Sequence, residues 1–233
     1  MNIFRTLLCT FFLLFFLPLT CGETKVVVCL HGFMRTKGNM WKIEKEYRKE
    51  GWTVINHGYP SRSKYIKDHA EDLVKELCII AEKHPEQPIH FTTHSLGGII
   101  VRAAINHPDC PTQAKQGCAV LIAPPNQGSS FARYLGKNII IRSLMGPFAG
   151  QELAKKEDFN YLGQFPDTMK ILVLAGNSGR NPVIRGKNDG KLKVEETFLL
   201  TPHMHKEVKA IHSLISSNSE VINHAKEFLK ASS

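Results

Sequence analysis

The sequence predicts one α/β domain built on a doubly wound, mostly parallel β-sheet with a small helical cap. From residue 25 onward, short apolar runs typical of buried strands alternate with longer segments of helical periodicity, and this alternation favours right-handed βαβ units. The chain has 233 residues, of which 42% are hydrophobic and 22% charged. That size and composition suit a single globular domain with a substantial core, so no second domain is expected.

Residues 1–22 stand apart from this domain. One arginine precedes the apolar run TLLCTFFLLFFLPLT, and small residues follow it, which is the arrangement of a secretory signal peptide. The run is shorter than the ~20 residues that span a bilayer comfortably, and an N-terminal membrane anchor is the alternative. We therefore expect the protein to be exported, periplasmic or secreted, with the α/β domain in residues 25–233.

The first half of the domain predicts three strands, each followed by a helix. The run KVVVCL carries consecutive β-branched residues, as expected of a strand buried on both faces. The strands are predicted at 25–30, 52–56 and 89–93, and the helices at 39–50, 65–84 and 96–107. Asn39 is a candidate N-cap of the first helix and Gly51 the residue that ends it, while Pro108 stops the third.

The second half continues the pattern but contains an insertion. Strands are predicted at 118–123, at 170–176 and around 196–200, and a final helix at 220–229. Residues 128–166 interrupt the alternation and resemble short helices. Because sites in doubly wound sheets form at the carboxyl ends of the strands, we expect this insertion to cover the site as a small cap.

The formal net charge is +9 and is spread over several segments. After export, such a charge favours anionic lipid headgroups or envelope polymers over nucleic acid, although a solvated basic surface without any partner explains it equally well. We therefore expect no nucleic-acid partner, and peripheral contact with an anionic membrane is a hypothesis.

Four cysteines fall within the predicted domain. Cys29 lies in an apolar strand and Cys78 on a helix face, so both are expected to be small buried residues. Cys110 and Cys118 flank the polar loop PTQAKQG, and an oxidising compartment would let them close it with a disulfide. That disulfide is a hypothesis, because it depends on a Cα separation that the sequence does not give.

The stretch FTTHSLGG, residues 91–98, places Ser95 between a predicted strand and a predicted helix. A nucleophilic serine needs this context, because a tight turn exposes its hydroxyl and the N-terminus of the following helix points at the developing oxyanion. Gly97 is small enough for strand and helix to approach closely, whereas Thr93 is larger than the glycine usual at its position. The alternative is a serine that only caps the helix.

Acyl transfer also needs oxyanion donors, a general base and an acid that orients the base. The segment LHGF follows the first strand, and Gly32 allows the backbone N–H of Phe33 to point at the same place as that of Leu96. His31, in the same segment, is expected to be structural and not the base.

Chain order selects the base, because in such sites the histidine follows the acid and lies between the last strand and the last helix. The late histidines are His203, His205, His212 and His224. Only His212 has the required loop position just ahead of the final helix. The HMH segment with His212 could also be interpreted as three zinc ligands, but no carboxylate or cysteine stands nearby to complete a metal site.

The acid is expected in the loop after the strand at 170–176. That loop contains one aspartate, Asp189, in an Asn-Asp-Gly turn. A carboxylate here would accept the Nδ1–H of His212 and fix its tautomer. The alternatives are that Asp189 is only turn chemistry, or that Glu195 or Glu196 takes its place.

The chain resembles the bacterial esterase/lipase branch of the α/β-hydrolase fold superfamily, which includes triacylglycerol lipase-like serine hydrolases. Four blocks carry the resemblance: LHGF, GYPSRS, FTTHSLGGIIVR and APPNQGS. In addition, NDGKLKVEET and HSLI resemble the family's acid and histidine regions. The resemblance implies an α/β-hydrolase fold and assigns Asp189 and His212 independently of chain order. Within that branch a threonine before the His-Ser pair is familiar. Substrate-binding residues are expected at His31, Gly32, Met34, His94, Asn126 and Gln127.

Together these observations predict a serine carboxylic ester hydrolase that acts through Ser95, His212 and Asp189 and an acyl-enzyme. An acyltransferase, thioesterase or amidase with the same residues is the nearer alternative, and a non-catalytic binding protein is the farther one. The expected substrate is a small-molecule or lipid ester, with no metal or cofactor implied. Acyl chain length, headgroup and oligomeric state are not predicted.

Overall fold

The computed structural model describes residues 24–232, so the predicted signal peptide lies outside the described residues. Six parallel strands form one sheet in the order β2-β1-β3-β4-β5-β6. The strands are β1 (Val26–Leu30), β2 (Thr53–His57), β3 (Ile89–His94), β4 (Ala119–Ile122), β5 (Ile171–Gly176) and β6 (Met204–Val208). The predicted doubly wound parallel sheet is therefore confirmed.

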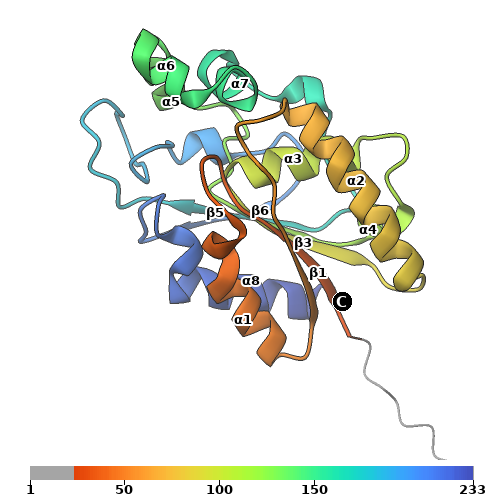
Figure 1. Ribbon diagram of the computed structural model, residues 1–233. Helices are drawn as coiled ribbons and strands as arrows, with labels where there is room; N and C mark the ends of the chain where they lie inside the picture. The colour runs from red at the N-terminus through yellow and green to blue at the C-terminus, as the bar shows by residue number, and fades with distance from the viewer. Residues whose placement is uncertain (1–23, 233) are drawn as a thin grey trace, which may run out of the picture.

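Helices cover both faces of this sheet (Figure 1). The α-helices are α1 (Trp41–Lys49), α2 (Ile66–Lys83), α3 (Leu96–Ile105), α4 (Thr112–Gln116), α5 (Ser130–Gly136), α6 (Ile139–Met145), α7 (Ala149–Lys155) and α8 (Ser219–Ala231). Short 3₁₀ turns are η1 (Lys37–Met40), η2 (Asn160–Leu162), η3 (Glu195–Thr197) and η4 (Ile215–Ser217).

The alternation of side chains along each strand divides the core into two layers. Val26, Val28 and Leu30 of β1 belong to the apolar cluster that contains α2 and α3 residues. Val27 and Cys29 belong to the cluster that contains α1 and α8 residues. Both clusters consist of residues between 26 and 229, so the chain from Thr24 onward contains the whole described sheet and core.

All strands run in the same direction, so one end of the sheet holds every amino end and the other holds every carboxyl end. The described chain enters β1 two residues after Thr24, at the amino ends of the strands. Helices α5, α6 and α7 lie beyond the opposite end, at the top of Figure 1. The insertion expected at 128–166 therefore stands at the carboxyl ends of the strands.

Glu152 of α7 connects the insertion to the body of the domain. One carboxylate oxygen accepts a hydrogen bond from the backbone N–H of Ile66 at 2.8 Å, at the N-terminus of α2. The other accepts from the hydroxyl of Tyr161 at 2.7 Å. A negative charge is favourable at a helix N-terminus, so this contact stabilises the insertion where it is.

Helix boundaries agree with the sequence prediction in part. Gly51 follows α1 with φ +80°, the left-handed conformation that glycine adopts without strain, and this prediction is confirmed. The prediction that Asn39 caps the helix is wrong, because Asn39 lies inside η1 and Met40 precedes α1. The loop PTQAKQG also contains a short helix, α4, which was not predicted.

The strand expected around 196–200 is not present there. Residues 195–197 form η3, and the last strand is β6, a few residues later. β6 lies at the edge of the sheet, and its sequence MHKEV has exposed Met204 and Lys206. An edge strand is covered less than a central one, so β6 lacks the continuous apolar run that predicted β1.

The hypothesis of a disulfide between Cys110 and Cys118 is wrong for this structure, in which both thiols are free. Cys110 packs in the cluster with α2 and α3, whereas Cys118 packs in the cluster with α1 and α8. Cys118 directly precedes β4, where alternation turns its side chain to the face opposite that of Ala119 and Cys110. Within residues 24–232, no helix is both long and apolar enough to cross a bilayer.

His69 of α2 makes acid stability a testable property of the fold. Its side chain is buried, and neither ring nitrogen has a hydrogen-bond partner among the described residues. Burial lowers the pKa of His69 to about 4, against the opposing effect of the Asp72 carboxylate. The folded state therefore takes up this proton only at a much lower pH than the unfolded chain, whose histidine pKa is ~6.5.

We expect the free energy of unfolding to fall as the pH drops from ~6.5 to ~4, with His69 contributing up to about 3 kcal/mol. His69→Leu should flatten this dependence, while His90, whose pKa burial also lowers to about 4, keeps part of it. Urea unfolding across this pH range measures the effect. Parallel curves for the two proteins would contradict it.

Candidate active site

Ser95 occupies the single-residue turn between β3 and α3. Its backbone has φ 53° and ψ −120°, a conformation that costs a residue other than glycine about 1–3 kcal/mol. Two hydrogen bonds impose it: the N–H of Ser95 donates to the carbonyl of Ile122 at 2.8 Å, and its carbonyl accepts from Gly98 at 3.0 Å. Such local strain is typical of a nucleophile elbow.

The two glycines after Ser95 provide the space that this turn requires. A Cβ on Gly97 would lie 2.8 Å from the carbonyl oxygen of Leu30 and 2.9 Å from that of His31, so α3 begins in direct contact with the end of β1. A Cβ on Gly98 would lie 3.1 Å from the hydroxyl of Thr93. Gly98 therefore accommodates the threonine that stands where a glycine is usual.

His212 connects Ser95 to Asp189. The Nε2 of His212 lies 3.1 Å from the Oγ of Ser95, and its Nδ1 lies 2.7 Å from Oδ2 of Asp189. Because a carboxylate only accepts hydrogen bonds, Nδ1 carries the proton and Nε2 is free to accept the proton of Ser95. The structure thus brings together the three residues that chain order selected.

Backbone hydrogen bonds hold Asp189 in place independently of its contact with the His212 ring. Its side chain is almost fully buried, and its Oδ1 accepts hydrogen bonds from the backbone N–H groups of Lys191 and Leu192 at 2.9 and 2.8 Å. The backbone N–H of His212 donates to the carbonyl of Asp189 at 2.8 Å. The Asn-Asp-Gly turn therefore positions the carboxylate as well as reversing the chain.

His94 supports the loop that carries His212. Its Nε2 donates to the backbone carbonyl of His212 at 3.1 Å, and the two rings lie 5.0 Å apart. Burial, followed by the nearby His212, lowers the pKa of His94 well below its ordinary value. A neutral His94 can therefore hold the His212 loop without placing a positive charge beside it.

The loop after β1 lies directly against the serine. A Cβ on Gly32 would lie 3.0 Å from the Cβ of Ser95, so only glycine lets this loop come so close. The backbone N–H of Met34 donates to the hydroxyl of Ser61 at 2.9 Å, and the hydroxyl of Tyr59 donates to the carbonyl of His31 at 2.6 Å. The GYPSRS turn thus fixes the loop that contains Phe33.

A cavity of about 320 Å³ opens at Ser95 and His212. Its lining is mostly apolar and comes largely from α5, α6 and α7, so the insertion forms the wall of the cavity and not only a distant cover. The lining residues are Phe33, Met34, Ser95, Pro125, Ser129, Phe131, Ala132, Leu135, Ile141, Leu144, Met145, Leu153, Lys191, Leu192 and His212.

Of the residues expected to bind substrate, Met34 is in this lining, and Gly32 lies behind Ser95. His31 and His94 are buried outside the lining, and their contacts position the two loops. Asn126 and Gln127 are also outside it, because their side-chain amides donate to the backbone carbonyls of Thr197 and Phe198 at 2.8 and 3.0 Å. These two hydrogen bonds hold the segment around η3 against the loop that follows β4.

Lys191 and Ser129 line the cavity but were not singled out in the sequence. The hydroxyl of Ser129 donates to the carbonyl of Lys191 at 3.2 Å, which joins the start of the insertion to the loop that carries Asp189. Burial, then the charge of Arg35, lowers the pKa of Lys191. The position of Lys191, two residues after the candidate acid, was the one signal that could have indicated it.

The other late histidines lie outside this site. His205 bonds to the hydroxyl of Thr197 at 2.9 Å and stacks on Phe198, while His203 bonds to the carbonyl of Thr201 at 2.8 Å. Within residues 24–232, no three histidine, cysteine or carboxylate side chains gather closely enough to hold a metal ion.

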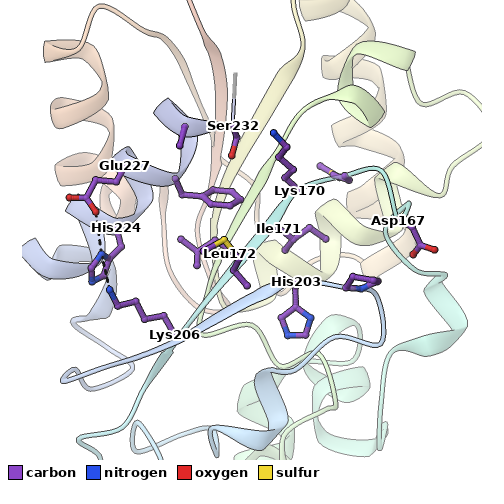
Figure 2. Close-up of a pocket in the computed structure, with 14 residues that line it drawn as sticks. Asp167, Lys170, Ile171, Leu172, His203, Lys206, His224, Glu227 and Ser232 are labelled. Atoms are coloured by element: carbon purple, nitrogen blue, oxygen red, sulfur yellow. Dashed lines mark hydrogen bonds and ion pairs between the residues drawn. The ribbon is translucent and has the colours of Figure 1, made fainter.

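A larger cavity, of about 650 Å³, lies elsewhere, between α8 and the first residues of β5 and β6. Figure 2 shows Lys206 pointing to His224 there, with Leu172 and Ile171 farther to the right along the same cavity. Because β5 and β6 begin at this cavity, it lies at the opposite end of the sheet from Ser95. It is therefore separate from the candidate active site.

Residues 21–216 match the family described as "Putative serine esterase (DUF676)". The chain belongs to this family. That membership agrees with the resemblance found in the sequence. It supports ester hydrolysis as the general activity of the chain. A search of curated proteins finds no match to the chain.

Solved structures similar to this DUF676 chain include the mature lipase BlEst2 of Bacillus licheniformis, with a TM-score of 0.71, 17% identity, and coverage of 89% of this chain and 93% of that one. The Pyrococcus furiosus esterase PF2001 has a TM-score of 0.61 and 18% identity, with 90% and 82% covered. Phospholipase PlaB of Legionella pneumophila has 0.62 and 16%, with 89% and 58% covered. At these identities the likeness shows the fold, and the predicted α/β-hydrolase fold is confirmed.

Proposed function

We propose that the protein hydrolyses carboxylic esters through Ser95, His212 and Asp189 and an acyl-enzyme intermediate. One observation carries the proposal: a single imidazole lies within hydrogen-bond distance of both the Ser95 hydroxyl and the buried Asp189 carboxylate. This is the geometry by which a histidine activates a serine. Membership of a serine esterase family supports it.

In the proposed reaction, the Oγ of Ser95 attacks the ester carbonyl carbon while Nε2 of His212 takes the hydroxyl proton. The resulting oxyanion accepts hydrogen bonds from the backbone N–H groups of Phe33 and Leu96. As the C–O bond to the alcohol breaks, His212 returns the proton to the departing alcohol. Water then attacks the acyl-enzyme with His212 as base, which releases the acid and restores Ser95.

The chemistry of the lining supports an apolar acyl group as the part of the substrate that the cavity takes. Phe131, Leu135, Ile141 and Met145 surround the space next to Ser95, and an acyl chain that enters this space loses its contact with water. Because the cavity is bounded by the insertion, α5 and α6 are expected to determine which chain lengths fit.

A fluorophosphonate probe tests the proposed nucleophile directly, because it reacts with an activated serine and not with a helix-capping one. We expect one probe per chain, located on Ser95 by peptide mass spectrometry, and slower labelling in the presence of a hydrolysable ester. Labelling that is absent, or located on another serine, would contradict the assignment. Product analysis with an added alcohol distinguishes hydrolysis from acyl transfer.

A further inference from the structure

The tip of the insertion exposes a group of large aliphatic side chains. Ile139 and Ile140 are each 69% exposed and Leu144 is 60% exposed, all on α6. Contiguous exposed apolar side chains commonly mark a surface that binds a partner or a membrane. These three residues are called the α6 tip below.

The α6 tip is continuous with the interior of the candidate active site. Leu144 belongs to the tip and also lines the cavity, and Ile141 and Met145 of the same helix line it farther in. Met34, which is 57% exposed, lies at the cavity on the side of the loop after β1. An apolar molecule leaving a lipid layer at the tip would therefore meet apolar side chains on its way to Ser95.

The segments that form and adjoin the α6 tip carry an excess of basic residues, and the acidic Glu152 of α7 is already hydrogen-bonded to Ile66 and Tyr161. Residues 129–146 contain Arg133, Lys137 and Arg142 and no acidic residue. The neighbouring segment 177–193 contains five basic residues and a single acid, Asp189, whose buried carboxylate is bonded to His212. Lys187 in this segment is paired with Glu207. An apolar tip flanked by an excess of positive charge is complementary to an anionic lipid surface, whose headgroups attract the cations while its acyl layer takes up the apolar side chains.

We propose that the α6 tip docks the protein on anionic lipid bilayers, so that esters held in such a surface are its substrates. The claim about substrates rests on the proposed function, whereas the docking itself does not require catalysis. Binding is expected to combine two contributions: insertion of the apolar tip, which is insensitive to salt, and attraction of Lys137 and Arg142 to the headgroups, which salt screens.

Vesicle sedimentation with the chain from Thr24 onward tests the docking. Ser95→Ala is included as the background so that the lipid is not consumed. The vesicles consist of phosphatidylcholine alone or with phosphatidylglycerol, at ~0.1 M and ~1 M salt, where charges act over ~10 Å and ~3 Å. We expect binding that prefers phosphatidylglycerol at low salt and loses that preference at high salt.

Substitutions separate the two contributions. Replacing Ile139, Ile140 and Leu144 together by serine should weaken partitioning into both kinds of vesicle by about tenfold or more. Lys137→Glu with Arg142→Glu should remove the preference for phosphatidylglycerol, again by about tenfold.

Matched changes elsewhere serve as controls. Ile79→Ser, at an equally helical site on α2 that is 51% exposed, should leave binding unchanged, whereas the single change Ile140→Ser should reduce it. Lys42→Glu with Lys83→Glu alters the net charge as much as the tip pair does, at exposed positions on α1 and α2, and should have a smaller effect. Equal thermal unfolding midpoints verify that each variant is folded.

Three results would overturn the docking proposal: no binding to either vesicle, equal binding to both at low salt, or a serine-substituted tip that binds as tightly as the parent. Light scattering tests a fourth outcome. If the parent is a dimer that the three serine substitutions dissociate, while vesicle binding stays the same, the tip is a contact between two copies and not a membrane-binding surface. Hydrolysis of a water-soluble ester by the unsubstituted protein is measured separately, so that failure of catalysis and failure of docking are distinguishable.

Discussion

Ser95→Ala is expected to lower kcat for ester hydrolysis by at least about 10³-fold, because the acyl-enzyme can no longer form. The chain should remain folded, since alanine keeps the Cβ of Ser95 and loses only the hydroxyl, and the backbone bonds to Ile122 and Gly98 do not involve the side chain. Hydrolysis of a chromogenic ester measures the loss. Activity above about a tenth of the unsubstituted value would exclude Ser95 as the nucleophile.

Ser95→Gly provides the matched control for the strained backbone. Glycine adopts positive φ without the strain that a side chain incurs, so this variant should be as inactive as Ser95→Ala but more stable by about 1 kcal/mol. Chemical unfolding of the two variants gives the difference. Equal stabilities would mean that the strain at Ser95 does not exceed the conformational entropy that glycine loses on folding.

His212→Ala is expected to be nearly as damaging as the loss of the serine, by about 10³-fold or more in kcat, because the hydroxyl of Ser95 loses its proton acceptor. His203→Ala and His205→Ala serve as controls, since both side chains bond to the segment around η3 instead. These two should retain activity within a few-fold, at some cost in stability.

A chelator is expected to leave the unsubstituted enzyme unchanged. The result that would reverse the assignment of His212 is a loss of activity with EDTA that zinc restores, because HMH and His212 would then be metal ligands. A strong loss of activity in His203→Ala together with a mild loss in His212→Ala would also exclude His212 as the general base.

The sequence predicted the central strands well because each is buried on both faces, and burial on both faces requires a continuous apolar run. β6 was missed for the opposite reason. As an edge strand it presents Met204 and Lys206 to solvent, so its pattern resembled a loop, while the more apolar ETFLL beside it resembled a strand. Local composition alone could not place this edge of the sheet, although it did place β2 at the other.

The candidate site was predictable to the extent that chain order determines it. Ser95, Asp189 and His212 follow the order that the connections of the sheet impose, and the structure brings them together; their catalytic roles remain a prediction. Asn126 and Gln127 were expected to bind substrate, but their amides bond to backbone carbonyls outside the cavity. Which carbonyls lie within reach of an amide cannot be predicted from the sequence. The cavity lining depends on how α5, α6 and α7 turn toward Ser95, which periodicity in such short helices does not determine.

The common direction of the strands determines which side of a membrane-bound molecule works on that membrane. Thr24 precedes β1 at one end of the sheet, and the α6 tip lies beyond the other, with strands of five or six residues, roughly 20 Å, between. A molecule tethered through its N-terminus would turn its active site away from the tethering bilayer, toward the aqueous space or an opposing membrane. A molecule without a tether could instead bind the bilayer tip-down, as proposed above. If the predicted leader exists, its retention or removal would determine which membrane surface the proposed docking site faces.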